Sequence, residues 1–248
     1  MIIKNGSVGG IPNASRNPFL NGEITFDGPW QVGWEIYDGK LYAEAVIVKS
    51  GTLTVQKQYI CDLWMIGGGG GSATMTSNYY DWRAGGGSGF TEAAIGKILG
   101  IALHPVTIGA GGANRESYKE TNYSTGVAGT QGGKTSMLGV SANGGNPGKI
   151  AITNEEDQPH TWAIGTGGSN GGTAWRTSVG GSMTAKQAPG ENGTPGAGKI
   201  MSRFWDATKN TDYGRANGTA AQGAGWGLSG AGYGAGGTSG ALVIRIAI

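Results

Sequence analysis

Glycine-rich tracts dominate the chain from residue 67 onward, and they restrict its fold more than any other feature. Glycine makes up 52 of the 248 residues, about three times its usual share of ~7%. The tracts include GGGGG at 67–71 and GAGGTSG immediately before the last apolar segment. Leucine, isoleucine, valine and phenylalanine are sparse after residue 66, so an ordinary apolar core is hard to build there. We therefore expect the glycine tracts themselves to form the core.

Disorder is the alternative interpretation of so much glycine. Two features oppose it: apolar, strand-like segments punctuate the tracts, and the chain contains eight Trp and nine Tyr, whereas disordered segments are poor in aromatic residues. An ordered glycine tract can adopt the polyproline-II-type helix, which has three residues per turn and no internal hydrogen bonds. Its N–H and C=O groups must then bond to neighbouring tracts, which predicts a bundle of rods.

The sequence alternates between about ten tracts and five polar, aromatic inserts. These inserts lie at about 72–83, 113–125, 149–164, 173–179 and 200–222. We divide residues 165–172 into two tracts at Ser169 and Asn170. Rods that run up and down gather the inserts at one end and the short strands at the other. The last segment, ALVIRI, is then predicted to hold the chain end in the basal sheet.

Residues 1–60 have the composition of an ordinary globular segment, and residues 40–56 predict two strands joined at Ser50 and Gly51. We therefore predict a mainly non-α fold of two parts. A small α/β or β attachment module occupies 1–60, and a polyglycine type II helix sandwich with short basal strands and distal loops occupies 61–248.

The whole chain resembles the tip adhesins of the long tail fibres of T-even-type bacteriophages. The similarity rests on the opening MIIKNGSVGG and on the framework segments WMIGGGGGS, HPVTIGAGG and GAGGTSGALVIRI. The resemblance implies a polyglycine-II sandwich whose distal loops bind an outer-membrane receptor of the bacterium, usually a porin-type protein. It also implies a virion protein, one copy per fibre tip, whose N-terminal module docks on the distal end of a trimeric fibre.

The inserts combine aromatic and basic residues with Ser, Thr, Asn and Gly, which is the composition of an antibody paratope. Packing against the rods is the alternative role for each aromatic residue. The residues that we expect at the receptor interface are Tyr79, Tyr80, Trp82, Tyr118, Tyr123, Trp162, Trp175, Arg176, Phe204, Trp205 and Tyr213. The receptor is expected to be a protein, with lipopolysaccharide as the other candidate.

The N-terminal module carries apolar residues that a module of this size has difficulty burying, so a docking face is plausible. The alternative is a compact core around one tryptophan. The residues expected to dock on the fibre are Ile2, Ile3, Phe19, Trp30, Trp34 and Tyr37.

Other function classes find little support in the sequence. The net charge of +2 gives no electrostatic case for nucleic acid, and neither a secretory signal nor an apolar stretch of ~18 residues is recognisable. Cys61, His104 and His160 are isolated, so no metal, cofactor or catalytic residue is predicted. AGTQGGKT at 128–135 matches a phosphate-loop pattern only loosely and lacks a following helix. We expect no enzyme; the other candidate function is a glycine-rich structural or ice-binding protein.

Overall fold

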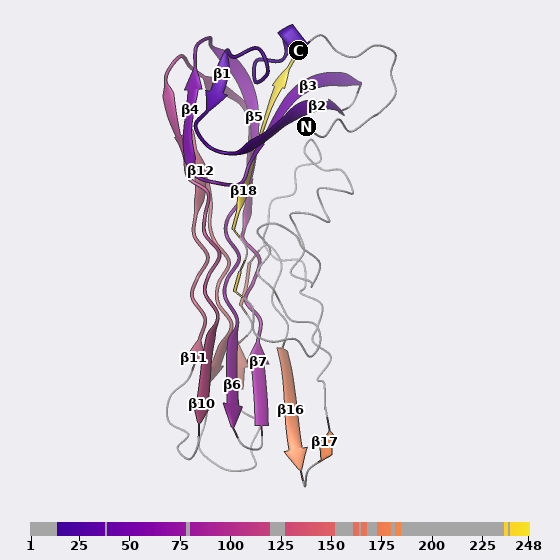
Figure 1. Cartoon of the computed structure of the whole chain (residues 1–248), viewed down its shortest axis with the longest axis vertical. Helices are drawn as coiled ribbons and strands as arrows, with labels where there is room; N and C mark the ends of the chain where they lie inside the picture. The colour runs from indigo at the N-terminus through magenta and orange to yellow at the C-terminus, as the bar shows by residue number, and fades with distance from the viewer. Residues whose placement is uncertain are drawn as a thin grey trace.

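The fold is an elongated arrangement in which extended glycine tracts connect sheets at two opposite ends (Figure 1). The computed structural model describes residues 14–37, 39–77, 80–119, 127–151, 161–163, 165–167, 173–179, 182–184, 236–237 and 239–248. We call the end that holds the C-terminus the base and the opposite end the tip. The one helix among the described residues is the 3₁₀ turn η1 (Ala14–Arg16), so the mainly non-α class is confirmed.

The larger base sheet is antiparallel and has the strand order β2-β3-β18-β5-β8. Its strands are β2 (Trp30–Tyr37), β3 (Lys40–Ile47), β5 (Tyr59–Ile66), β8 (Thr91–Leu99) and β18 (Ala241–Ala247). The C-terminal strand β18 lies at the centre, paired with β3 and β5. Residues 241–246 are all buried, as expected for an apolar run covered on both faces. The prediction that ALVIRI holds the chain end in the basal sheet is confirmed.

The smaller base sheet, with order β1-β4-β9, shares one apolar core with the larger sheet. Its strands are β1 (Ile24–Phe26), β4 (Gly51–Val55) and β9 (Leu103–Val106), and a hairpin of β12 (Thr135–Met137) and β13 (Val140–Ala142) lies beside β9. Ile24 and Leu53 from the smaller sheet pack in the same core cluster as Leu63 and Leu242 from the larger sheet and Met137 from the hairpin.

The N-terminal segment forms the two strands predicted for residues 40–56 and shares its core with later parts of the chain. The two strands are β3 and β4, and they belong to different sheets. The boundary predicted at residue 60 falls inside β5 (Tyr59–Ile66), and the shared core draws on both sides of it. A segment of this length buries too little apolar surface alone, so it is completed by strands from later in the sequence.

The glycine tracts are bonded to one another along their length. The tract at 67–72 runs from the base towards the tip and is hydrogen-bonded to four others. Those four tracts lie at 85–90, 109–115, 129–133 and 143–148. Shorter described pieces at 165–167, 236–237 and 239–240 extend the assembly through bonds such as Gly237 N to Gly112 O, 2.7 Å. Backbone groups thus replace side chains as the internal contacts.

Bonds to a given neighbour recur at every third residue. The amides of Gly68 and Gly71 donate to the carbonyls of Gly133 and Thr130, each at 2.9 Å. The carbonyls of the same two glycines accept bonds from tract 143–148. A spacing of three residues means that each tract presents one row of groups to each of its neighbours.

Glycine is required in these tracts because the backbones approach each other too closely for a side chain. A Cβ built on Gly71 would overlap the carbonyl oxygen of Ala113, and one built on Gly89 would overlap that of Gly67. Ala110 and Ala113 lie where their tract faces outward: both are exposed, although the glycines immediately before them are buried.

Two sheets form the tip. The first has the order β10-β6-β7-β16-β17, and the second has the order β11-β14-β15. Their strands are β6 (Ala73–Ser77), β7 (Tyr80–Ala84), β10 (Arg115–Lys119), β11 (Val127–Ala128), β14 (Lys149–Ala151), β15 (Thr161–Ala163), β16 (Thr173–Val179) and β17 (Ser182–Thr184). The inserts were predicted to be loops, so the structure corrects this expectation for their described parts. Extended tracts that lie side by side continue naturally into paired strands.

Candidate functional site

The tip sheet brings together strands that are far apart in the sequence. β6 and β7 come from the first insert, β10 from the second and β16 from the fourth (Figure 1). β10 is parallel to β6, whereas β7 is antiparallel to both β6 and β16. Each strand follows or precedes a glycine tract, so the packing of the tracts sets the order of strands at the tip.

Six of the eleven residues predicted for the receptor interface lie in strands of the tip. These are Tyr80 and Trp82 in β7, Tyr118 in β10, Trp162 in β15, and Trp175 and Arg176 in β16. The other five, Tyr79, Tyr123, Phe204, Trp205 and Tyr213, lie outside the described residues. The described candidates therefore occupy paired strands, which restrict the backbone more than free loops would.

The register of the first tip sheet places residues of β6, β7 and β16 side by side in rows across the strands. Trp82 of β7 is paired with Trp175 of β16 on one side and with Met75 of β6 on the other. The next row pairs Asp81 with Arg176. Trp82 and Trp175 thus share one row of the register, which we call the aromatic row, and the neighbouring row pairs an acidic residue with a basic one.

Two of the six predicted docking residues of the N-terminal segment, Phe19 and Trp30, lie in or against the core of the base. Phe19 is buried, and its ring meets the edge of Trp30 at a centroid distance of 5.7 Å. Trp30 packs against the apolar core, and Trp34 is half-buried on β2. Tyr37 ends β2, while Ile2 and Ile3 lie outside the described residues. Phe19 is therefore not exposed for a direct contact with a partner.

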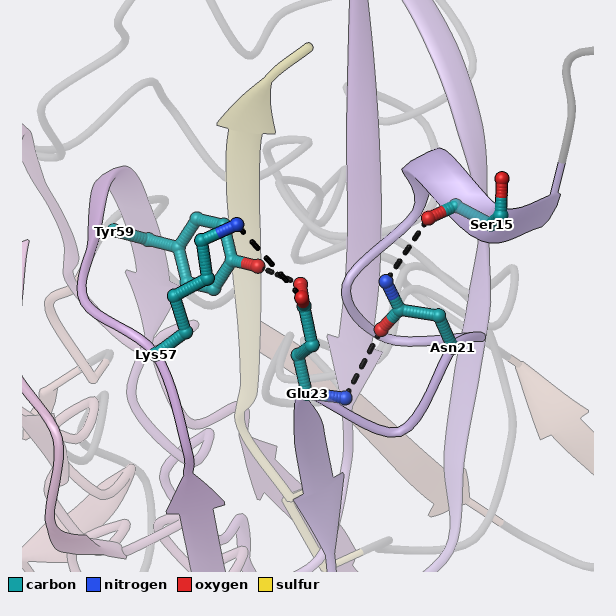
Figure 2. A network of polar contacts seen from close by, with 5 residues as sticks. All are labelled: Ser15, Asn21, Glu23, Lys57 and Tyr59. Carbon is teal, nitrogen blue, oxygen red and sulfur yellow. Dashed lines mark hydrogen bonds and ion pairs between the residues drawn. The ribbon is translucent and has the colours of Figure 1, made fainter.

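A network of polar contacts lies at the end of the base that is remote from the tracts (Figure 2). The Tyr59 hydroxyl donates a hydrogen bond to the carboxylate of Glu23, and Lys57 Nζ lies 3.7 Å from the other carboxylate oxygen. Asn21 accepts a bond from the Glu23 amide at 2.9 Å and donates one to the Ser15 carbonyl at 3.0 Å. The network ties the segment before β1 to the turn between β4 and β5.

These contacts shift the ionisation of both partners. The hydrogen bond from Tyr59, followed by that from Asn21, lowers the pKa of Glu23. Burial raises the pKa of Tyr59, and the hydrogen bond to Glu23 raises it further. The pair is thus held as a carboxylate and a neutral phenol, which is a structural arrangement rather than a reactive one.

Of the isolated residues Cys61, His104 and His160, the structure describes the first two. Burial, with a contribution from Asp62, raises the pKa of the Cys61 thiol to about 12. His104 Nε2 lies 2.8 Å from the Gly100 carbonyl within the β8–β9 turn. The described part of the chain holds no group of three His, Cys, Asp or Glu residues suited to a metal ion. Nor does any helix in it have the length and apolar character needed to cross a membrane.

The relaxed phosphate-loop match lies within the tract assembly. Residues 129–133 form a glycine tract and lead into β12, and no helix follows them. The amides of Gly129, Thr130, Gly132 and Gly133 donate hydrogen bonds to other tracts, such as Gly132 N to Gly145 O at 3.0 Å. These amides are therefore not free to bind a phosphate there.

One surface at the base was missed by the sequence analysis. Large apolar side chains are exposed around the β8–β9 turn, at Ile98, Ile101 and Leu103, and at Ile60 beside it. The signal was present as the apolar run ILGIAL at 98–103, which is unusual for a turn. The run alone does not predict an exposed surface, because an apolar run of this length is also typical of a buried strand.

The comparison with protein families gives one clear result. The model of the glycine-rich domain matches residues 47–244, which is most of the chain. No curated protein matches the chain. The matched region contains the tracts, the tip strands and, in the base, β4, β5, β8, β9, the β12–β13 hairpin and the first part of β18. The chain therefore belongs to the glycine-rich domain family.

Proposed function

We propose that the tracts are polyglycine type II helices packed as a sandwich. Bonds to each neighbour that recur at three-residue spacing are what a helix with three residues per turn produces. The pattern of exposure supports the same period, since Ala110 and Ala113 are exposed three residues apart. Ordering the backbone costs ~1–2 kcal/mol per residue, and the bonds between tracts offset this cost. The result is a stiff support with both ends fixed.

On this support we propose an adhesin that recognises a bacterial surface through the tip. The observation that carries the proposal is the convergence of four separate inserts at one end, away from the base. The aromatic row at Trp82 and Trp175 supplies anchors of the type that dominate protein interfaces. Because paired strands are already ordered, little conformational entropy is lost when a receptor binds.

The expected context is the distal tip of a T-even-type phage tail fibre, with one copy per tip. The base would then attach to the trimeric fibre, and the tip would contact a porin-type outer-membrane protein. Lipopolysaccharide is the other receptor considered. In this role the protein is not an enzyme and needs no cofactor.

Binding of the purified chain to sensitive bacterial cells tests this function. We expect binding that is lost after protease shaving of the cell surface; persistence after shaving would identify a polysaccharide receptor instead. Trp175→Ala in β16 should weaken binding by at least about tenfold. Trp34→Ala at the base is the matched control and should leave cell binding unchanged. If the folded wild-type chain binds no cells, the adhesin function is wrong and a structural or ice-binding role is favoured.

A further inference from the structure

Polar side chains form a chain of hydrogen bonds across the outward side of three glycine tracts. Gln131 Nε2 donates to Asn146 Oδ1 at 3.3 Å, and Asn146 Nδ2 donates to Thr166 Oγ1 at 2.7 Å. Gln131 and Thr166 are exposed, and Asn146 is half-buried. The tracts that these residues join are 129–133, 143–148 and 165–167. Side chains therefore add to the backbone bonds at this level of the tracts.

Asn146 is the centre of this chain, and its backbone is bonded as well. Its amide donates to the Thr166 carbonyl at 2.8 Å, and its carbonyl accepts from the Gly87 amide at 3.0 Å. A side-chain amide offers both an acceptor and donors, so one asparagine can bridge two neighbours. Pro147 follows, and the residue before a proline is restricted to extended backbone, which a tract requires. Asn146 thus links its own tract to three others.

The tract at 165–167 that Asn146 holds lies between two strands of the tip in the sequence. It follows β15, which carries Trp162, and precedes β16, which carries Trp175 and Arg176. Three of the predicted receptor residues thus lie on strands attached to this tract. Asn146 supplies two of its hydrogen bonds, one from the backbone and one from the side chain. The position of the tract therefore limits where both strands can lie.

The same tract lies where β16 begins to pair with β7, its neighbour in the tip sheet (Figure 1). The Gly165 amide donates to the Gly85 carbonyl at 2.9 Å. Gly85 follows directly on Ala84, the last residue of β7, which is the register partner of Thr173, the first residue of β16. The bond between the tracts is therefore made one residue along the chain from the first pair of the two strands.

We infer that Asn146 is a positioning residue for the tip: its side chain fixes the tract at 165–167 and so keeps β16 aligned with β7. The inference rests on the proposed function, because these two strands carry the aromatic row that is the proposed receptor contact. A fixed support under the strands lowers the entropy that receptor binding costs. Without the side-chain bonds the backbone bonds between tracts remain, so the fold persists while β16 opens more often.

Hydrogen exchange of the β16 amides in variants of the full chain tests this role. Asn146→Ala removes both side-chain bonds, and we expect at least about fivefold faster exchange in β16. Thr166→Val removes the bond to Asn146 Nδ2 from the other side and should accelerate the same amides. This second variant keeps the test decisive if Asn146→Ala proves too unstable to measure.

Two further variants separate positioning from a general loss of stability. Asn146→Asp is the conservative change: a carboxylate still accepts from Gln131 and can accept from the Thr166 hydroxyl. Its exchange in β16 should stay within about twofold of the wild type. Thr130→Val is the matched control, because it removes a side-chain acceptor that lies 2.7 Å from the Ala113 amide and joins two other tracts. It should leave the exchange of β16 unchanged.

Binding to sensitive cells separates this inference from the proposed function. We expect Asn146→Ala to weaken binding at least about fivefold and Asn146→Asp to restore it. If Asn146→Ala changes neither the exchange of β16 nor cell binding, or only one of them, the inference is wrong although the adhesin function stands. Equal effects of Thr130→Val would also overturn it, because any lost bond would then suffice. If the wild type binds no cells, the proposed function fails, and faster β16 exchange in Asn146→Ala would still support the role of Asn146 in holding that strand.

Discussion

At the scale of the residue, glycine acts in this protein mainly through what it lacks. The described glycines with positive φ are Gly22, Gly39, Gly96 and Gly139, and all four lie outside the tracts. In the tracts the missing Cβ is what allows backbones to approach within hydrogen-bonding distance. Conformational freedom is the property usually associated with glycine, but close approach is the property used here.

Two glycine-to-alanine substitutions separate these properties. Gly89→Ala places a Cβ against the Gly67 carbonyl, so we expect it to lower the free energy of unfolding by at least about 3 kcal/mol. Gly100→Ala is the control, because nothing lies within 4 Å of its Cβ position and its φ is not positive. It should change the free energy by less than about 1 kcal/mol. Urea unfolding measures both, and equal effects would contradict the close-packing explanation.

Cys61 provides a second residue-scale prediction. Burial raises the pKa of its thiol to about 12, so almost no thiolate forms at pH 8 and the sulfur is shielded from reagents. Labelling with a thiol reagent should therefore be slow in the native protein and complete within minutes in denaturant. Rapid stoichiometric labelling of the native protein would show that the base core opens readily.

The Glu23–Tyr59 pair predicts a dependence of stability on pH. The lowered pKa of Glu23 means that the folded state favours the carboxylate. The stability that this gives is fully present above the pKa of the unfolded chain, near 4.5, and is lost as pH falls through the pKa of the folded state. The raised pKa of Tyr59 means that the neutral phenol stabilises the folded state below pH ~10, and this stability is lost as pH rises through the pKa of Tyr59 in the folded state. Tyr59→Phe should flatten the stability profile at both extremes. Lys57→Met is the control, because Lys57 contributes least to the lowered pKa of Glu23. This substitution should change the stability at acid pH only slightly.

At the scale of the element, pairing between distant strands matters more than neighbours in sequence. β18 completes the larger base sheet between β3 and β5, and its apolar residues reach into both core clusters. Arg245, also on β18, is buried and bonds Glu44 on β3 at 2.6 Å. The last strand thus supplies both apolar and ionic contacts to strands formed from the first quarter of the chain.

Removing β18 should prevent folding. Leu242, Val243 and Ile244 are fully buried, and each contributes ~1.5–3 kcal/mol, so together they approach the whole stability of a domain, ~5–15 kcal/mol. A chain that stops at Gly240 is expected to lose its cooperative melting transition. Deleting Ile248 alone, which is exposed, is the control and should leave the transition in place. A cooperative transition in the longer truncation would show that β3 and β5 do not need β18.

At the scale of the whole molecule, the hydrogen-bond register between the tracts determines how the strands at both ends are aligned. Inserting one glycine after Gly70 shifts the tip half of the central tract out of its three-residue register, and the bonds from Gly71 are lost. We expect this insertion to abolish the cooperative transition. Two residues added between β6 and β7 lengthen only the connection at the tip, and loop extension costs little, ~0.6 kcal/mol per doubling of length. The melting temperature of this second variant should fall by only a few degrees; equal damage from both insertions would contradict a rigid support.

The sequence by itself determined the class of the molecule. The glycine content, the apolar strands and the order of tracts and inserts are local features, so they predicted a non-α fold and a final strand in the base. Six of the predicted tip residues do lie in tip strands, because each insert follows directly on a tract. Their pairing as strands was not predicted, since polar segments rich in Ser and Thr carry no clear alternation.

Only the tertiary structure decided which strands pair and which apolar residues stay exposed. The sequence placed a boundary at residue 60, but the core joins both sides of it because neither side buries enough surface alone. Phe19 and Ile98 are both apolar residues of ordinary appearance in the sequence, yet one is buried and the other is exposed. Burial depends on what the rest of the chain places against a residue. That information lies in the packing of distant segments.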